Sequence, residues 1–381
     1  MARYAGRRSK CIQSTLGELR LQRAYYHCTQ CGNGFFPRDR ALGIENTSAS
    51  PGLQRMIAHV GALVSFAEGQ ELLKDLAGVA VDAKQVERVA EAVGREVAQD
   101  EQAQTLPLTM EALPPTLYVG LDGTGLPMRP EALVGIAGKQ PDGSAKTREA
   151  KLCCVWSAEG RDERGRPVRD VGSVSYTAAI ESAATLDTAR ELSPFAQRVQ
   201  READRRRLYA ASRLAALGDG ALWIWKIVDE LFPGAIQILD RYHAKEHLSD
   251  VAKALFGKDA ATTKSWAEER HTELDSGQTD AILAALQEHA TTSEEAEQCV
   301  GYIENNRQRM RYPLFEAMGL VTASGQVEAG CRVVAGTRLK RSGMRWTVPG
   351  ANAILALRAC RLSGRFEDFW QRRAASNKAA A

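Results

Sequence analysis

The order of strands and helices expected in the middle of the chain predicts an α/β fold built on a mixed sheet. Three apolar strands joined by Gly-, Asp- and Arg-rich turns come first, and a helix–strand–helix–strand series follows them. The strands are expected at residues 116–121, 150–157, 168–176, 213–217 and 235–239, and the helices at 193–207 and 221–232. This is the element order of an RNase H-like core, with helices on the faces of the sheet.

The first part of the chain combines a β-hairpin with a pair of cysteines. Residues 13–27 alternate weakly between apolar and polar and predict the hairpin. Cys28 and Cys31 follow in a CxxCG turn, which is half the ligand set of a zinc ribbon, and Cys11 is the one cysteine upstream. Either a first cysteine pair is missing from a truncated start, or the knuckle holds no Zn²⁺. Residues 1–45 are therefore expected to form a small zinc-ribbon-like hairpin.

Residues 50–105 are expected to form a helical DNA-binding region. The spacing of apolar residues predicts helices. A turn at Gly78 followed by a helix-capping residue, Asp82, is typical of a helix-turn-helix motif. The second helix would present Lys84 and Arg88 to a major groove. A plain helical hairpin is the alternative interpretation.

The remaining boundaries follow from changes in composition. A polar and then proline-rich stretch at 101–115 predicts a linker. The first part of the core then covers residues 115–243, and an Ala-, Glu- and Gln-rich stretch at 244–324 predicts a long helical insertion. Residues 325–373 would complete the core with C-terminal helices and a basic DNA-binding segment.

Three acidic residues have the surroundings of a metal-dependent active site. Asp122 and Asp219 each stand where an apolar strand ends and a glycine-rich turn begins, which predicts that both lie at the carboxyl edge of the sheet. Glu328 opens a helix and is flanked by small residues. Three such carboxylates could hold two Mg²⁺ or Mn²⁺ ions for phosphoryl transfer. The alternative is that either aspartate belongs to an ordinary Asp-Gly turn of a β-hairpin and has no catalytic role.

Three long segments together point to a known family. They are YVGLDGTGLPM, LGDGALWIWKIVDELFPGAIQILDRYHAKEHL and SGQVEAGCRVVAGTRLKRSGMRW, and they occur in this order. The chain resembles the DDE transposases of bacterial insertion sequences of the ISKra type, in the Mutator-like superfamily. The resemblance extends to RAYYHCTQCGNGFFPRD near the start and GRFEDFW near the end.

The resemblance implies a catalytic triad of Asp122, Asp219 and Glu328. It also matches Asp240 and His243 to an Asp-x-x-His signature, which argues against Asp240 as the second acid and places His243 near the reacting phosphate or a carboxylate. The implied reaction is cleavage at the ends of the element and joining of each 3′-hydroxyl to target DNA. Asp122 would bridge two metal ions, with Asp219 and Glu328 each holding one.

The basic segment after Glu328 is expected to bind DNA. Its cationic side chains would hold phosphates, and Trp346 would stack on a base or else lie in the core. The cations concerned are Arg338, Lys340, Arg341 and Arg345.

The charge distribution agrees with a nucleic-acid partner. Residues 1–40 have a net charge of +6 and residues 329–381 have a net charge of +9. Since the whole chain has a net charge of +3, the residues between these two ends have a net charge of −12. The expected partners are double-stranded DNA, both terminal inverted repeats and target, and a second copy of the chain in a homodimer or higher oligomer. No apolar run is long enough for a membrane span, the eight cysteines are too sparse for a disulfide scaffold, and a bacterial cytoplasm is expected.

Two rival functions remain at this stage. His243, Glu246 and His247 match the HxxEH pattern of a zinc metallopeptidase, with two imidazoles on one helix face and a glutamate as base. A non-catalytic DNA-binding protein derived from a transposase is the other.

Overall fold

The central sheet has five strands in the order β10-β9-β4-β5-β8. β4 is parallel to β9 and β9 is parallel to β10, whereas β5 runs antiparallel to both β4 and β8. This mixed topology confirms the predicted α/β class and is consistent with an RNase H-like fold. The strands are β4 (Thr116–Pro127), β5 (Thr147–Ser157), β8 (Ser175–Ala179), β9 (Arg213–Gly218) and β10 (Ile236–Leu239).

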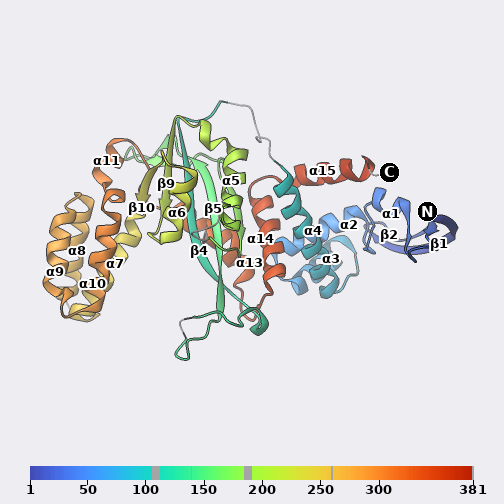
Figure 1. Ribbon diagram of the computed structural model, residues 1–381, viewed down its shortest axis with the longest axis horizontal. Helices are drawn as coiled ribbons and strands as arrows, with labels where there is room; N and C mark the ends of the chain where they lie inside the picture. Colours follow the sequence, from blue (N-terminus) through green and yellow to red (C-terminus); the bar gives the residue numbers. More distant parts are fainter. Residues whose placement is uncertain (105–111, 139, 184–190, 259–260, 380–381) are drawn as a thin grey trace.

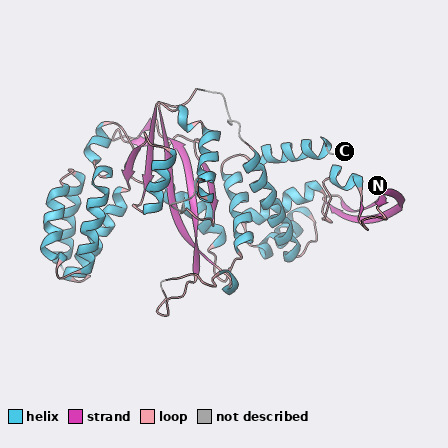
Figure 2. Cartoon of the chain, viewed as in Figure 1, coloured by secondary structure: helices cyan, strands magenta, loops and turns pink. Residues whose placement is uncertain are grey.

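The molecule is elongated, with the N-terminal hairpin at one end, the helical insertion at the other and the sheet between them (Figures 1 and 2). The computed structural model describes all residues except 105–111, 139, 184–190, 259–260 and 380–381. The expected linker at 101–115 falls partly outside the described residues, and its first residues belong to a helix instead. Within the described ranges, no helix combines the length and the apolar character needed to cross a membrane.

Two strand predictions were wrong. β4 does not end at Asp122 but continues to Pro127, because β5 supplies hydrogen-bond partners along its whole length and no turn is needed. The third strand lies later than expected, since the stretch before it forms a two-residue ribbon, β6 (Gly160–Arg161) with β7 (Pro167–Val168).

The N-terminal region forms a three-stranded sheet and then helices. β1 (Arg3–Ser14) and β2 (Gly17–His27) make a hairpin longer than predicted, and β3 (Gly34–Phe35) pairs with β2. The helices are α1 (Pro37–Ala41), α2 (Pro51–Leu63), α3 (Phe66–Ala77) and α4 (Ala83–Ala103). A left-handed Gly78 ends α3, and Asp82 caps α4, as expected.

α4 is a core helix over most of its length. It packs against α14 (Val348–Leu362) so closely that a Cβ on Gly94 would lie 2.2 Å from the Ala353 carbonyl oxygen. Its Val93 and Val97 belong to the same apolar core as the sheet. A helix-turn-helix in which α4 lies freely in a DNA groove is therefore not supported, because one side of α4 is packed into this core.

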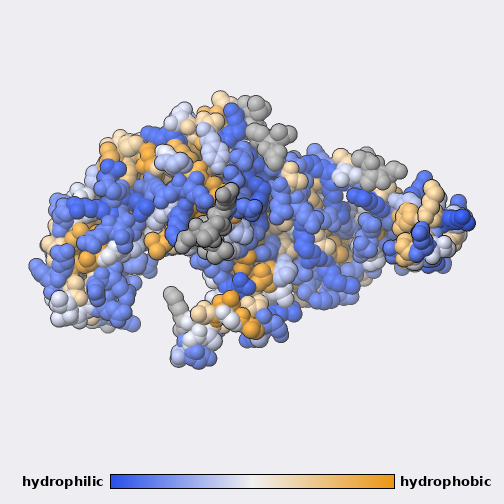
Figure 3. Space-filling model, in the orientation of Figure 1, coloured by the Kyte–Doolittle hydropathy of each residue, from blue (hydrophilic) through white to orange (hydrophobic). Residues whose placement is uncertain are grey.

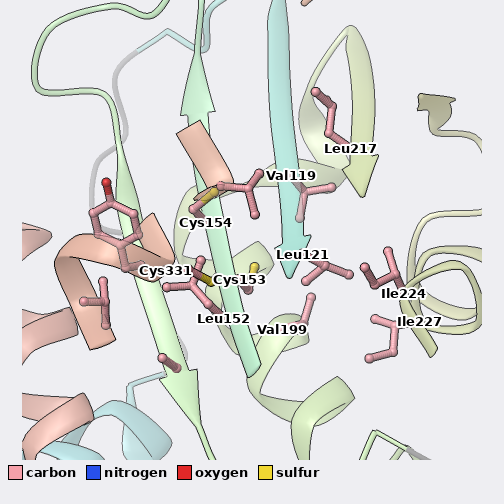
Figure 4. Packing of buried hydrophobic residues seen from close by; sticks show 14 of the residues in the cluster. Val119, Leu121, Leu152, Cys153, Cys154, Val199, Leu217, Ile224, Ile227 and Cys331 are labelled. Atoms are coloured by element: carbon pink, nitrogen blue, oxygen red, sulfur yellow. The ribbon is translucent and has the colours of Figure 1, made fainter. Parts of the chain in front are cut away.

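Both faces of the sheet are covered by helices. On one face, Leu121 lies toward Val199 of α5 (Pro194–Arg206) and toward Ile224 and Ile227 of α6 (Leu222–Leu231), as Figure 4 shows. On the other face lies a continuous helical stretch made of α12 (Gly325–Gly330), a π-helical turn (Cys331–Gly336) and α13 (Thr337–Leu339). The absence of a side chain on Gly120 permits this approach, since a Cβ there would lie 2.2 Å from Val327.

The insertion is built mainly of helices, as predicted, and residues 318–324 form a non-helical segment that leads back to the core. It comprises α7 (Arg241–Phe256), α8 (Ala261–Asp275), α9 (Thr279–Ala290), α10 (Glu294–Asn306) and α11 (Tyr312–Ala317). The expected C-terminal helices include α14 and α15 (Phe366–Ala379), with a break between them. The break occurs at Gly364, whose φ of +72° no helix accommodates.

A buried ionic cluster joins the helices on either side of β8. Glu202 of α5 is fully buried and pairs with Arg205 at 2.7 Å and with Arg365 at 2.9 Å. Arg365 also contacts Glu101 of α4 at 3.0 Å. Burial alone would raise the pKa of Glu202, but the two guanidinium groups hold it at about 2.

We expect Glu202→Gln to lower the free energy of unfolding by about 3–5 kcal/mol, because buried guanidinium groups lose their counter-charge. The depressed pKa of Glu202 means that its contribution is present above pH 4.5 and is lost as the pH falls toward about 2. Urea titrations between pH 2 and 7 should therefore show a smaller acid-induced loss of stability in the variant. The control is the exposed α6 variant Glu230→Gln, and an equal pH dependence in Glu202→Gln and the wild type would contradict the assignment.

Candidate active site

Three aspartates lie in a row at the carboxyl edge of the sheet. The parallel pairing of Gly120 with Leu217, continued by two residues, sets Asp122 beside Asp219. Asp240 follows β10 and donates its backbone N–H to the Gly218 carbonyl at 2.8 Å, which sets it next in the row. In Figure 1 these strands run downward, so their carboxyl ends face the hollow that Figure 3 shows between the helical insertion and the protruding end of the β4–β5 hairpin.

Asp122 lies on the sheet face that is covered by α12. It accepts the backbone N–H of Gly123 at 2.6 Å and a hydrogen bond from the Cys331 thiol. Burial raises the pKa of Asp122, and the negative charge of Asp219 raises it further, while the two hydrogen bonds act in the opposite direction. The Asp122 carboxylate is therefore close to the Asp219 carboxylate and is partly shielded from water.

Asp219 is fixed by its own turn and by the insertion. Its side chain accepts the Ala221 backbone N–H at 2.9 Å, and its carbonyl accepts the Tyr302 hydroxyl at 3.0 Å. Gly220 has a φ of +104°, and a Cβ there would lie 2.7 Å from the Tyr302 ring. Only glycine suits this turn, and α10 of the insertion thus packs directly on the backbone that carries Asp219.

Asp240 and His243 form an ion pair beside these two acids. Their Oδ1 and Nδ1 atoms are 3.6 Å apart. The hydrogen bond to Asp240 raises the pKa of His243 to about 9, and the charges of Asp219 and Asp122 add to this. Burial would raise the pKa of Asp240, but hydrogen bonds from His243 and Ser324 hold it at about 2. His243 is therefore a cation at neutral pH.

The surroundings of the two histidines do not support the zinc-peptidase interpretation. His243 is paired with Asp240. The second histidine of the HxxEH pattern, His247, instead stacks on Tyr302 with ring centroids 4.1 Å apart. Among the described residues, no group of three or more His, Cys, Asp or Glu side chains is arranged to hold a metal ion.

The third predicted acid, Glu328, does not join the other two in this conformation. It lies exposed on α12, one helical turn before Cys331, which contacts Asp122. The adjoining carboxylates of Asp122 and Asp219 fit one divalent cation, because their oxygens are the ligands Mg²⁺ prefers and a cation would offset their mutual repulsion. The structure thus brings two of the three acids together and holds the third nearby on a neighbouring helix.

Three of the predicted DNA-binding cations in the basic segment are exposed, and one of them lies close to the row of aspartates. Lys340 contacts the Thr124 hydroxyl, two residues beyond Asp122 on the same face of β4. Arg345 is exposed. Arg341 is also exposed but forms an ion pair with Glu68 of α3, which depresses the pKa of that carboxyl to about 2.

The other two residues of the basic segment belong to the core. Arg338 is fully buried, donates to the Gly61 carbonyl at 2.9 Å and lies over the rings of Phe66 and Trp346. Trp346 is 6% exposed, and its indole N–H donates to the Leu339 carbonyl. Arg338 is therefore not placed to hold a phosphate, and Trp346 takes the core position, the second of its two predicted alternatives.

The predicted recognition face on α4 lies away from the carboxylates. Lys84 is exposed and pairs with Glu87, while Arg88 lines a groove of about 820 Å³ between α4, α15 and the loop at 43–48. Gln85, between them, is hydrogen-bonded to Gln13 of the hairpin. The hairpin therefore covers part of this face.

The cysteine knuckle forms a tight turn between β2 and β3. Gly32 donates to the Cys28 carbonyl at 2.9 Å, and a backbone N–H of Cys31 that points at the Cys28 sulfur lowers the pKa of this thiol. Cys11 pairs with Arg20 at the far part of the hairpin, roughly 25 Å along the strands from Cys28. It cannot share a metal ion with Cys28 and Cys31 within one chain.

Two residues of the site were missed by sequence reasoning. Cys331 could have been found, because it follows Glu328 by three residues and therefore lies on the same helix face. Tyr302 gave no signal, since it lies 83 residues from Asp219 in the insertion.

We expect the His243 imidazole to titrate near pH 9 and to return toward its ordinary pKa of 6.5 in Asp240→Asn. Because the folded-state pKa is the higher one, the pair stabilises the fold fully below pH 6.5, and this contribution is lost as the pH rises through about 9. NMR titration of the histidine ring signals measures this, with His289→Gln on α9 to help assign them. A wild-type His243 signal that titrates near 6.5 would refute the pairing.

Comparisons with known proteins show the family of this chain and a weak similarity to a solved structure. A search of the curated proteins found no significant match. Among solved structures, the chain is similar to one in the Drosophila P element transposase strand transfer complex, with 9% identity, a TM-score of 0.26, and coverage of 88% of this chain and 83% of that chain. The model of the uncharacterised protein family UPF0236 matches residues 3–373, and the chain therefore belongs to this family.

Proposed function

We propose that this protein is a DDE-type transposase, which binds the ends of a mobile DNA element, cleaves phosphodiester bonds there and joins the 3′-hydroxyl ends to target DNA. The observation that carries the proposal is the alignment of Asp122 and Asp219 at the carboxyl edge of a mixed five-stranded sheet, with Glu328 on a helix against the same face. The resemblance of the long sequence motifs assigns the catalytic roles to the same three residues.

In this proposal Asp122 and Asp219 hold divalent cations, Mg²⁺ or Mn²⁺, and Glu328 is the third acid that joins them when DNA binds. Bound metal ions would supply activation of the attacking oxygen and stabilisation of the leaving oxygen. The protonated His243 beside the row can donate a hydrogen bond to a phosphate oxygen. Partial burial of Asp122 beside Cys331 limits the amount of water that would weaken these interactions.

The DNA would lie in the hollow below the sheet edge. This surface is bounded by the insertion and the β4–β5 hairpin (Figure 3), and Lys340 reaches Thr124 on that hairpin. Pairing of two element ends by a homodimer or higher oligomer would follow from the reaction. Cleavage assays also separate the proposal from a non-catalytic DNA-binding protein, which would bind the same duplex without cutting it.

We expect Asp219→Asn to reduce Mn²⁺-dependent cleavage more than about a hundredfold, because one carboxylate of the cation pair is lost. The substrate is a labelled duplex that carries the inverted repeats flanking the gene, and binding of that duplex should change by less than about threefold. Asp229→Asn, on the exposed face of α6, is the matched control and should cleave as the wild type does. Undiminished cleavage by Asp219→Asn would rule out the assignment of the second acid.

We expect Lys340→Gln to weaken binding to all duplexes alike and to lower the slope of log affinity against log salt by about 1, because one phosphate contact is lost. Lys264→Gln, an exposed lysine on α8, is the control. Binding can be followed by fluorescence anisotropy between 50 and 300 mM salt. An unchanged salt slope in Lys340→Gln would place this side chain outside the DNA-binding surface.

A further inference from the structure

The Asp240 carboxylate connects the first turns of two helices. Its Oδ1 atom accepts the backbone N–H groups of Tyr242 at 2.6 Å and His243 at 2.9 Å, at the start of α7. Its Oδ2 atom accepts the backbone N–H of Ser324 at 2.5 Å, at the start of α12. Asp240 is only 2% exposed. Both oxygens are thus directed at backbone groups, which leaves this acid poorly suited to bind a metal ion.

Ser324 passes the connection on to Glu328. Its carbonyl accepts the backbone N–H of Glu328 at 3.0 Å and that of Val327 at 2.7 Å, which forms the first turn of α12. The side chain of Ser324 makes no capping bond, so the backbone alone carries the link. Two consecutive hydrogen bonds therefore lead from the Asp240 carboxylate to the backbone of the third acid.

The segment that leads to α12 is tied to the sheet at several points. Arg213, at the start of β9, donates to the Met318 carbonyl at 3.0 Å, and the Tyr118 hydroxyl accepts the Val321 N–H at 3.3 Å. The bond from Ser324 to Asp240 is the last of these ties before Glu328. It fixes the helix start at the level of the row of aspartates.

We propose that Asp240 is a positioning residue for Glu328. By clamping the backbone of Ser324 it fixes the start of α12, and so holds Glu328 on the helix that contacts Asp122, from where Glu328 can join the two aspartates when DNA binds. The inference rests on the proposed function in that Glu328 must take part in cleavage. It assigns Asp240 an indirect role, although this residue stands in line with the two acids proposed to bind metal.

Two variants break the clamp from opposite sides. Asp240→Asn replaces one acceptor oxygen by an NH₂ group, which cannot accept from Ser324 and from the α7 amides together. Ser324→Pro removes the donated N–H and leaves Asp240 intact, and the Ser324 φ of −83° lies near the range that proline adopts. Ser324→Ala keeps the N–H and is the matched control.

The first readout is amide hydrogen exchange of residues 325–330 in the full chain without DNA. Asp240→Asn and Ser324→Pro should each speed exchange there roughly tenfold, the effect of one lost buried hydrogen bond, while Ser324→Ala stays at the wild-type rate. Unchanged exchange in both clamp variants would overturn the proposal, whether or not the protein cleaves DNA.

The second readout is cleavage of the duplex that carries the flanking repeats. Both clamp variants should lower kcat roughly 10–100-fold with KM within about twofold, because a displaced acid impairs the reaction more than binding. A loss of kcat in Asp240→Asn alone, with normal exchange and with Ser324→Pro fully active, would identify Asp240 as a metal ligand and overturn the proposal. Faster exchange with normal kcat would also overturn it. A wild type that cleaves nothing would refute the proposed function, and the exchange rates would still decide whether the clamp exists.

Discussion

The parallel register of β4, β9 and β10 is the constraint on which the candidate site depends. The parallel pairing of these three strands stops at the same level of the sheet. The residues that follow the paired segments therefore lie side by side at one edge. Asp122, Asp219 and Asp240 occupy those positions. A slip of one residue in β9 would turn Asp219 to the opposite face, toward α5 and α6, because strand side chains alternate. The apolar residues that alternate with the acids therefore also determine the sheet face on which the acidic side chains lie.

Three neighbouring carboxylates repel one another, and the structure offsets this repulsion more fully at Asp240 than at Asp122. Asp240 accepts hydrogen bonds from three backbone N–H groups at the starts of two helices, and it faces the cationic His243. These interactions lower the pKa of Asp240 to about 2. Asp122 has fewer donors and a raised pKa. The pair formed by Asp122 and Asp219 is thus the part of the row that still lacks positive charge, and a bound cation would supply it.

Sequence reasoning predicted the sheet, the insertion and the position of Asp122 and Asp219 at one sheet edge, but it misjudged features that depend on the environment of a side chain. The Asp122-Gly123 pair looked like a turn, yet β5 provides partners that keep it extended. A basic run is normally solvated, yet Arg338 is buried between two aromatic rings whose positions no local pattern reveals. Trp346 could equally have been in the core or on the surface, and packing against Phe66 decides this. Periodicity predicts which face of an element is buried, but not which distant segment covers it.

The clamp at Asp240 also answers a problem that the insertion creates. More than eighty residues leave the core after β10 and must return to start α12 at the same edge, and closing so long a loop costs entropy that grows with the logarithm of its length. The insertion enters and leaves at one point: Arg241 donates its backbone N–H to the Thr322 carbonyl at 3.1 Å, and Asp240 accepts that of Ser324. These bonds close the insertion at its base, so that motion of its distal helices need not displace α12. On the other side, Tyr302 of α10 contacts the backbone of Asp219, so the same insertion touches the second acid. The insertion is thus anchored at Asp240 and packed on the backbone of Asp219, and Tyr312 of α11 donates a further hydrogen bond to the Leu239 carbonyl at 3.2 Å. Its helices therefore contact the sheet edge that carries the acids at several points.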